Sequence, residues 1–427
     1  MLNFRVANFR SFREAAELKF TRSPRREVAA FPYPDVVPAV AILGANAAGK
    51  SNLLRAISTM FSIVRTSATR VEEGLPYTPY MLSGEATGPT TFQVVVVLDE
   101  VRYEYGFSYD AERIHTEWLR SWPRGRQRTL FTRDIDDDET WQFGDSLTGA
   151  NQALAKATRP DALLLSTARV LNHDVLGPIQ QMLGSLVRTV GNGHAFEGLL
   201  QSSLEAMVND PQRREQVRQL ITSADLGIAD VDVEEEQLSD QFRETTRRLV
   251  EALNPSLTPE QVNAQLSRAP LRALMSHRGP NGPVQFLFEW ESTGTRNFFV
   301  LLGPILDRLA RGGVLIIDEI DANLHPRLVS EVVRFFQDPE RNPRQAQLLL
   351  STHDVTVMMN VGDYNVLERD QLWFVDKGED GSSRLTPLTA FSPRTGEVYS
   401  RNYLLGRYSG VPKIDSHNFH MKTDAAD

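Results

Sequence analysis

The chain has 427 residues, of which 41% are hydrophobic, and a formal net charge of −9. This length and composition support large buried cores, in one lobe with insertions or in two lobes. The negative charge argues against a globally basic nucleic-acid binder, and the absence of cysteine excludes disulfides and thiolate metal sites. No apolar run approaches the ~18 residues of a membrane span. No apolar signal block opens the chain, so we expect no membrane association and a cytoplasmic location.

The first part of the chain, residues 1–150, reads as a lobe of strands around one helix. The strand candidates alternate or are rich in β-branched and aromatic residues, and they lie at 2–8, 91–98, 102–109 and 117–121.

A phosphate-binding motif interrupts this lobe between an apolar strand at 39–43 and a helix at 50–63. The octet GANAAGKS, residues 44–51, matches G-x-x-x-x-G-K-[ST]. Its glycines let backbone N–H groups turn toward phosphates at a helix N-terminus, while Lys50 reaches the terminal phosphates and Ser51 ligates Mg²⁺. The motif predicts ATP and Mg²⁺ as ligands, with nucleotide contacts from Gly44, Asn46, Gly49, Lys50, Ser51 and Asn52.

The middle of the chain, 151–275, changes to helical spacing. Apolar residues recur at intervals of three and four in 163–171, 179–187, 196–208 and 242–253. This pattern predicts a helical insertion. Heptads sustained over long distances are missing, which argues against DNA tethering by long coiled-coil arms.

Residues 276–410 return to an α/β pattern, and ESTGTRN at 291–297 opens an apolar helix over 298–309. Hydroxyl groups and a glycine at a helix N-terminus form a second anion-binding device. Taken alone, the pattern means only a capped helix, with Ser292 or Thr293 as the cap.

An acid pair follows the buried strand 314–317. Because side chains alternate along a strand, Asp318 and Glu319 are expected to point in opposite directions. Asp318 is then the metal ligand beside Ser51, and Glu319 polarises the attacking water. The simpler alternative is a strand end with solvated acids.

A further apolar strand at 348–350 places His353 at the same sheet edge, where it can contact a γ-phosphate. A structural histidine at a strand end is the alternative. The run Ser351-Thr352-His353-Asp354 is not a hydrolase triad, because no nucleophile-elbow pattern surrounds the serine.

Basic residues are densest in two short stretches, and the end of the chain is polar. Arginines gather at 22–26 and 120–128, and each stretch is more simply a solvated loop. Residues 411–427 are predicted to form a disordered tail.

The order of GxxxxGKS, ESTGT, the acid pair and His353 resembles the ABC-type ATPase heads of SMC and RecF-like proteins, as does NFRSF at 8–12. More narrowly, the chain is similar to the AAA ATPases of phage-defence and abortive-infection operons, the RloA- and AbiLi-like group. That similarity covers most of the chain, in TTFQVVVVLDEVRYEYGF, ADLGIADVDVE, DEIDANLHP, DQLWFVDKGEDG and YLLGRYSGVP. The resemblance implies an α/β P-loop NTPase head with a mixed central sheet.

The resemblance also implies a composite site in a homodimer or higher homo-oligomer. Ser292, Gly294 and Thr295 of one copy would act on the ATP held by the other, and the loop 321–325 would line the seam. The glutamine that such heads carry after the P-loop is not clearly placed. Gln93 is a candidate, but its alternating flanks suit an ordinary strand residue equally well.

The leading hypothesis is an ATP-hydrolysing switch that controls a separately encoded effector, a nuclease or toxin. An ATPase with its own nuclease is one alternative, but residues 354–427 are too few for a further catalytic domain. A RecF-like DNA-binding ATPase is another, so DNA stays open as a partner. A transporter subunit fits least well.

Overall fold

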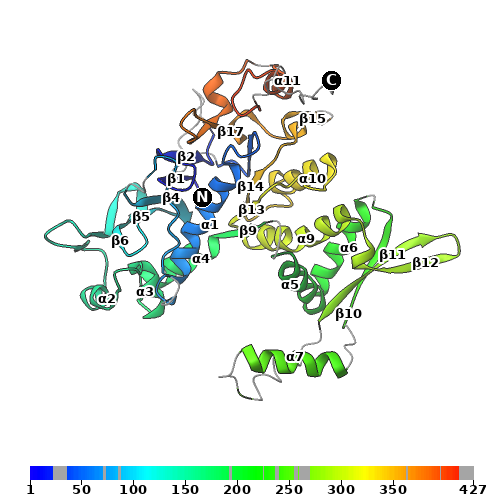
Figure 1. The fold of residues 1–427 in the computed structure, drawn as a ribbon, viewed down its shortest axis with the longest axis horizontal. Helices are drawn as coiled ribbons and strands as arrows, with labels where there is room; N and C mark the ends of the chain where they lie inside the picture. Colours follow the sequence, from blue (N-terminus) through cyan, green and yellow to red (C-terminus); the bar gives the residue numbers. More distant parts are fainter. Residues whose placement is uncertain are drawn as a thin grey trace, which may run out of the picture. The chain divides into compact units, whose positions relative to one another are not determined.

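The computed structural model describes residues 1–22, 36–70, 74–84, 88–191, 195–224, 226–235, 240–253, 258, 270–361, 364–394 and 396–412. The chain divides into two compact units (Figure 1). The first unit comprises Met1–Thr189, Arg308–Asp321 and Val329–Asp427, and the second comprises Val190–Asp307 and Ala322–Leu328. No helix within the described ranges combines the length and the apolar character needed to cross a bilayer.

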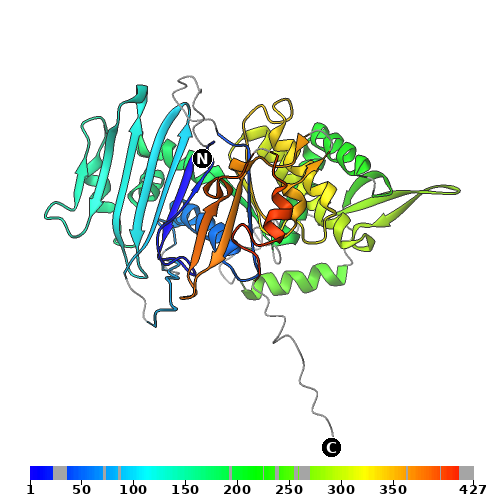
Figure 2. The ribbon, with the colours of Figure 1, turned by 90° about the horizontal axis from the view of Figure 1, so that it is seen from above.

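A seven-stranded antiparallel sheet forms one layer of the first unit (Figure 2). Alternation explains its buried face, because Phe92, Val94 and Val96 of one strand are buried, and the ring of Phe92 contacts that of Phe107 in the next strand edge-on. The sheet confirms the strands predicted for this lobe. Its strands, in spatial order, are β2 (Ala16–Lys19), β1 (Asn3–Ala7), β4 (Thr90–Leu98), β5 (Val101–Tyr109), β6 (Ile114–Trp122), β7 (Arg128–Asp134) and β8 (Trp141–Phe143).

A six-stranded mixed sheet forms the other layer. Four neighbouring strands, β17, β3, β14 and β13, are parallel, and β18 is antiparallel to β17. All residues of β3, β13 and β14 are buried, as expected for parallel strands covered on both faces. In spatial order the strands are β18 (Ser383–Pro387), β17 (Leu372–Lys377), β3 (Ala39–Gly44), β14 (Gln347–Ser351), β13 (Val314–Ile317) and β9 (Val187–Val190).

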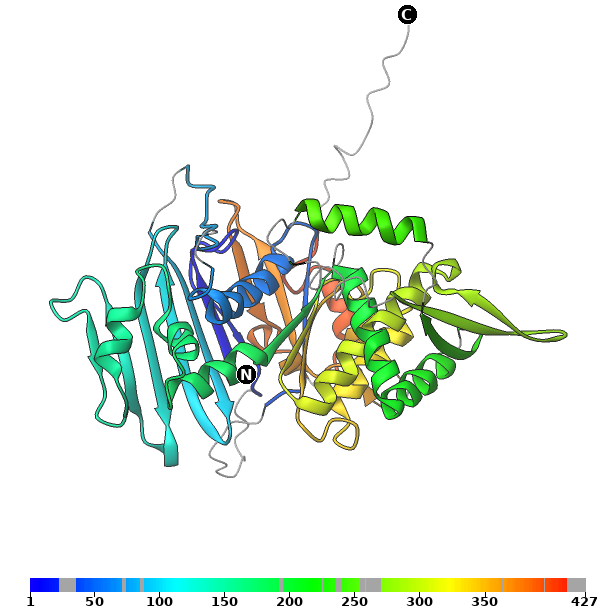
Figure 3. The same ribbon diagram turned by 90° about the horizontal axis from the view of Figure 1, so that it is seen from below.

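Helix α1 (Lys50–Thr66) lies between the two sheets (Figures 2 and 3). Its apolar face, including Leu53, Ile57 and Met60, joins both sheets in one buried cluster with α3 and α4. The remaining helices that lie wholly or mainly in this unit include α2 (Asn151–Ala157), α3 (Leu164–Val170), α4 (Leu176–Leu186), α10 (Pro326–Gln337) and α11 (Tyr399–Leu404).

Short elements complete the first unit. They are the 3₁₀ helices η1 (Pro123–Gly125), η3 (Val355–Met358), η4 (Arg369–Gln371) and η5 (Leu388–Phe391), and the strands β15 (Asn360–Val361) and β16 (Tyr364–Asn365).

The second unit combines helices with a three-stranded antiparallel sheet, β10-β11-β12. Helix α6 begins after Asp210, whose carboxylate accepts hydrogen bonds from two backbone N–H groups of the first turn. The elements are α5 (Ala195–Asn209), α6 (Pro211–Ser223), β10 (Ile228–Glu235), α7 (Asp240–Leu253), β11 (Leu271–Gly279), β12 (Gly282–Leu287), η2 (Phe288–Trp290) and α9 (Thr293–Arg311), the last of which continues into the first unit.

The segment predicted to be a helical insertion, 151–275, is helical for most of its described length. It also contains β9, β10 and part of β11, which pair with strands from outside or within it. Its first helices, α2 to α4, belong to the first unit. Most of the predicted tail, residues 413–427, lies outside the described residues.

Candidate functional site

Three chain segments meet at one edge of the six-stranded sheet. The loop 44–49 follows β3, the acids follow β13, and His353 follows β14, which lies between them. Because these strands are parallel, their carboxyl ends open at the same edge, where ligands bind in open α/β sheets. The first unit therefore contains every residue of this edge site.

The loop between β3 and α1 requires two of its glycines. Gly44 has a φ of 159° beside the carbonyl of Val375, whose oxygen would lie 2.4 Å from an added Cβ. Gly49 has a φ of 118° in the left-handed region, and a Cβ there would meet Ser383 Oγ at 2.2 Å. Since Gly49 is also the N-cap of α1, the loop presents the N-terminus of a long helix, which favours anions.

Lys50 is folded back over this loop. Its Nζ donates to the carbonyl oxygens of Gly44 at 2.8 Å and Ala45 at 3.1 Å, and the residue is only 6% exposed. Burial lowers the pKa of Lys50, and the carboxylates of Glu319, Asp318 and Asp321 partly oppose that shift. The ammonium is thus poorly hydrated, which increases its attraction to an added phosphate.

Two serine hydroxyl groups hold the acids beside the loop: Ser51 bonds Asp318, and Ser351 bonds both acids. Ser51 Oγ donates to Asp318 Oδ1 at 3.1 Å, and Ser351 Oγ donates to the same oxygen at 2.5 Å. Ser351 Oγ also accepts a hydrogen bond from the backbone N–H of Glu319 at 2.8 Å. Ser351, the last residue of β14, is completely buried, so its position is fixed by the sheet.

The prediction that strand alternation separates the side chains of Asp318 and Glu319 is wrong. Strand β13 ends at Ile317, so Asp318 and Glu319 lie in the turn that follows, where strand alternation does not apply. Glu319 adopts a φ of 52°, an uncommon conformation that costs free energy outside glycine. The turn leaves Asp318 bonded to two serines and Glu319 exposed.

His353 reaches the loop, as expected. Its Nδ1 lies 3.5 Å from Lys50 Nζ, and its backbone N–H donates to Asp321 Oδ2 at 3.2 Å. The imidazole is exposed. The other carboxylate oxygen of Asp321 is buried and makes no hydrogen bond within the described structure, which leaves one acceptor at this edge unsatisfied.

Asn46 within the motif and Asn52 directly after it differ in position. Asn46 is exposed at the top of the loop. Asn52 instead donates to Ser11 Oγ at 2.8 Å, and Ser383 Oγ lies 2.7 Å from Ser11 Oγ and 2.5 Å from the carbonyl oxygen of Ala48. Asn52, Ser11 and Ser383 thus hold the loop from behind.

The ESTGT segment lies in the second unit, at the start of α9. Ser292 Oγ accepts from the backbone N–H of Thr295 at 3.1 Å and therefore caps the helix. Ser292 is exposed, whereas Thr295 is only 4% exposed and its hydroxyl is 2.9 Å from that of Ser292. An added Cβ on Gly294 would lie 2.5 Å from the carbonyl oxygen of Asn323. Of the three predicted contacts, Ser292 has the most accessible side chain.

Gln93 lies in the middle of β4, opposite Arg5 of β1 and Gly106 of β5. It is half-buried. This position suits the alternative of an ordinary strand residue.

The residues at the sheet edge fit a Mg²⁺–nucleotide ligand. Mg²⁺ keeps several waters and needs only one or two protein oxygens besides substrate phosphates. Ser51 Oγ and Asp318 provide two such oxygens at one point. A cage of three or more acidic, histidine or cysteine side chains does not occur in the described ranges, and this kind of site does not require one.

Sequence patterns missed Ser351, Ser11 and Ser383 as supports of the site. Ser351 directly follows the predicted strand 348–350, is the final residue of β14 and lies next to the acid strand, and its place directly after that apolar run could have indicated it. Ser11 and Ser383 become adjacent to the loop only in the folded chain, where Ser383 N also donates to Ser11 O at 2.6 Å.

Comparison with solved structures returns distant likenesses. The SMC head domain from Thermotoga maritima is 14% identical, with a TM-score of 0.38 over 90% of this chain and 98% of that one. An SMC head bound to the C-terminal winged-helix domain of ScpA gives 14% identity and a TM-score of 0.38, over 90% and 96%. The cbiO1 protein of Clostridium perfringens, part of an ABC transporter complex, gives 10% identity and a TM-score of 0.31, over 95% and 96%.

Family comparison gives a more direct result, although no curated protein matches the chain significantly. The model described as "AAA domain, putative AbiEii toxin, Type IV TA system" matches residues 39–360, from β3 to the segment after His353. Together with β3, the glycine loop, α1 and the parallel strands, this match confirms the predicted α/β P-loop NTPase head. The narrower RloA- and AbiLi-like assignment stays a prediction. The chain belongs to the AAA-domain family of putative AbiEii toxins of type IV toxin–antitoxin systems.

Proposed function

We propose that this protein hydrolyses ATP in a Mg²⁺-dependent reaction and uses the cycle as a conformational switch. The observation that carries the proposal is the convergence of Lys50, Ser51, Asp318, Glu319 and His353 at the carboxyl edge of β3, β14 and β13. In P-loop enzymes, positioning and electrostatic stabilisation of the phosphates supply most of the catalysis.

Each side chain has a distinct task in this proposal. Lys50 neutralises charge on the terminal phosphates, and its donors now held by Gly44 and Ala45 become available to them. Ser51 and Asp318 would hold Mg²⁺, whose chemistry is to neutralise charge on the phosphate oxygens. Glu319, exposed beside them, accepts a hydrogen bond from the attacking water and orients it. His353, exposed and near Lys50, donates to the γ-phosphate.

The second half of the site is proposed to come from another copy of the chain. Ser292 and Gly294 lie at the N-terminus of α9, which offers backbone N–H groups to an anion. One copy would hold ATP in the glycine loop, and the ESTGT segment of a second copy would cover it. ATP binding would therefore pair the two heads, and hydrolysis would part them.

We further propose that this switch belongs to an antiviral defence system and controls a separately encoded nuclease or toxin. The support is the family's description as a putative AbiEii toxin of a toxin–antitoxin system and the similarity of the chain's motifs to abortive-infection ATPases. Partner capture from cells with the neighbouring genes present would identify the effector.

Light-scattering mass on a sizing column tests the switch, with phosphate release as the parallel readout. We expect Glu319→Gln to bind ATP, to double in mass only with ATP and Mg²⁺, and to lose at least a hundredfold in turnover. Lys50→Ala is the control, because it should lose nucleotide binding and stay a monomer. Normal turnover by Glu319→Gln would remove the assigned role of that residue.

A further inference from the structure

A hollow of about 620 Å³ on the first unit gathers arginines from four separate segments. Its lining contains Arg55 and Arg65 of α1, Arg10 of the turn after β1, Arg70 beyond the end of α1, and Arg188 of β9. None of the described residues lining it carries a carboxylate. The hollow is therefore positively charged, although the whole chain has a net charge of −9.

The floor of the hollow is the polar face of α1. Residues 55, 58, 59, 62 and 65 recur at helical spacing opposite the buried apolar face, so their side chains share one surface. Arg65 donates to the carbonyl of Gly184 at 3.2 Å, and Ser58 Oγ lies 2.7 Å from Thr189 Oγ1 of the segment that carries Arg188. The basic surface is thus fixed to its surroundings at two points.

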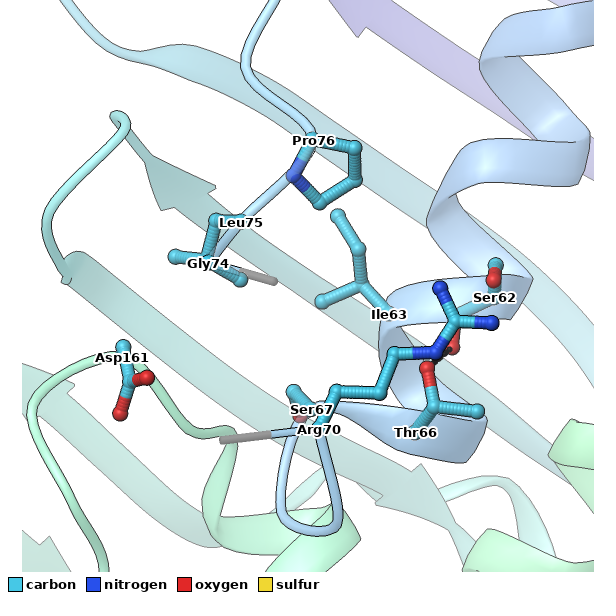
Figure 4. A pocket seen from close by; sticks show the side chains of 9 residues that line it. All are labelled: Ser62, Ile63, Thr66, Ser67, Arg70, Gly74, Leu75, Pro76 and Asp161. Atoms are coloured by element: carbon cyan, nitrogen blue, oxygen red, sulfur yellow. Dashed lines mark hydrogen bonds between the residues drawn. The ribbon is translucent and has the colours of Figure 1, made fainter. Parts of the chain in front are cut away.

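The adjoining pocket at the end of α1 is too small for a ligand that contacts several of these arginines. Figure 4 shows Arg70 beside Thr66 and Ser62, with Leu75 and Pro76 on the other side. Its volume of about 30 Å³ is room for a water molecule. A larger ligand must therefore lie in the open hollow, which shares Ser62, Arg70 and Pro76 with this pocket.

The arginines are close enough to affect one another. Burial, and secondarily the charge of Arg55, lowers the pKa of the Arg10 guanidinium. Burial and the neighbouring Arg70 act in the same way on the pKa of Arg65. These guanidinium groups remain protonated and repel each other, so a multiply charged anion between them would relieve the repulsion.

We propose that this hollow binds the phosphodiester backbone of a nucleic acid. Guanidinium forks bind phosphate oxygens in pairs, and arginines spread over four segments suit phosphates spaced along a strand better than a single phosphate. The aromatic residue in the lining, Phe61, is 1% exposed and offers no face for base stacking. Binding is therefore indifferent to base sequence.

Two residues connect the hollow to the glycine loop. Helix α1 begins with Lys50 and Ser51 and carries Arg55 one turn later. Arg10 lies in the hollow, while its neighbour Ser11 accepts from Asn52 and touches Ser383 behind the loop. Nucleic acid held at Arg10 and Arg55 would thus change the rate of ATP hydrolysis. This coupling rests on the proposed ATPase function, whereas the binding itself does not.

Fluorescence anisotropy with labelled 30-residue probes tests the binding, using single-stranded DNA, single-stranded RNA and duplex DNA of mixed sequence. The test variant is Arg55→Glu with Arg188→Glu. The control is Arg113→Glu with Arg126→Glu, two exposed arginines away from the hollow that give the same change in net charge. We expect at least tenfold weaker binding by the test variant only, and a salt slope for single strands smaller by about 1.4.

Several results would overturn the proposal. One is an equal loss of probe affinity in the two variants, and another is no binding of any probe by the wild type at low salt. A third is that tripolyphosphate competes as well as a strand at equal phosphate concentration, which would indicate a small-anion pocket. Phosphate release measured with and without probe separates the two ideas. Probe binding without any ATPase activity would contradict the proposed function and leave the hollow's role intact. ATPase activity without probe binding would contradict the hollow's role and leave the proposed function intact.

Discussion

Ser351 donates a 2.5 Å hydrogen bond to Asp318, from the end of one strand to the residue just after its neighbour. Because the same hydroxyl accepts from the N–H of Glu319, it fixes together the two acids that we propose as metal ligand and water-orienting group. Groups that orient metal ligands typically contribute 10- to 100-fold to affinity or activity.

Ser351→Ala should therefore lower turnover by about 10- to 100-fold and raise the Mg²⁺ concentration needed for half-maximal rate, with little change in nucleotide binding. Phosphate release across a Mg²⁺ titration measures both effects. Ser166→Ala is the matched control, because Ser166 is equally buried but bonds Ala68 in another part of the unit. An unchanged Mg²⁺ dependence in Ser351→Ala would mean that the hydroxyl serves folding alone.

Nucleotide affinity should fall at alkaline pH. Burial lowers the pKa of Lys50 below its usual 10.5, so the empty site loses this proton at a lower pH than an exposed lysine does. Binding needs the ammonium, and affinity should decline as the pH rises toward 10. A fluorescent ATP analogue titrated between pH 7.5 and 10 measures this decline. Lys50→Arg, which stays charged, should bind more weakly but without the decline, and a flat wild-type profile would contradict the prediction.

The trans contact is better tested at Ser292 than at Gly294. Any side chain at Gly294 would collide with the carbonyl of Asn323, so Gly294→Asp confounds charge with packing. Aspartate and asparagine are both good N-caps and can replace Ser292 as acceptor for Thr295 N. In a Glu319→Gln background, Ser292→Asp should bind ATP but fail to dimerise, because its charge opposes the phosphates. Ser292→Asn should still dimerise, and equal behaviour of the two variants would exclude a phosphate contact.

The buried Glu117 should give the unfolding free energy a measurable pH dependence. Its carboxylate accepts from Leu164 N at 2.7 Å, Leu165 N at 3.2 Å and Tyr105 Oη at 2.8 Å, yet burial outweighs these bonds and raises its pKa above 4.5. The folded state then binds this proton more tightly than the unfolded state. The associated stability is present below pH 4.5 and is lost as the pH rises through the folded-state pKa.

Glu117→Gln should remove that dependence. Urea unfolding at several pH values from 4 to 8 should show the wild-type advantage over the variant shrinking as the pH rises. Glu112→Gln is the control, since Glu112 is exposed. A constant difference between wild type and Glu117→Gln would show that folding does not shift the pKa of Glu117.

Local motifs predicted which segments meet at the sheet edge, because the carboxyl ends of neighbouring parallel strands lie at the same edge whatever the sequence of the connecting segments. The glycine loop and Asp318 directly follow apolar runs, His353 follows another after two residues, and the three runs pair as β3, β13 and β14. The alternation expected for Asp318 and Glu319 failed because β13 ends at Ile317, before either acid.

The basic hollow could not be predicted from local charge density. Arg120, in the densest basic stretch, forms an ion pair with Glu104 at 2.8 Å, and Arg124, Arg126 and Arg128 are exposed near the turn between β6 and β7. Of the earlier stretch, residues 23–26 lie outside the described residues. The arginines that do gather come from positions 10, 55, 65, 70 and 188, which only the folding of β1, α1 and β9 brings together.

The distance along the chain between Lys50 and His353, 303 positions, has a consequence for synthesis. Strand β14 separates β3 from β13, so the loop and the acids cannot face each other until β14 has been inserted between them. A ribosome must translate about five-sixths of the chain before those contacts exist, and domains are generally completed from the N-terminal side. A nascent or truncated chain would thus carry the whole glycine loop without the acids and the histidine, so the proposed nucleotide turnover would begin only in molecules whose translation has run past His353.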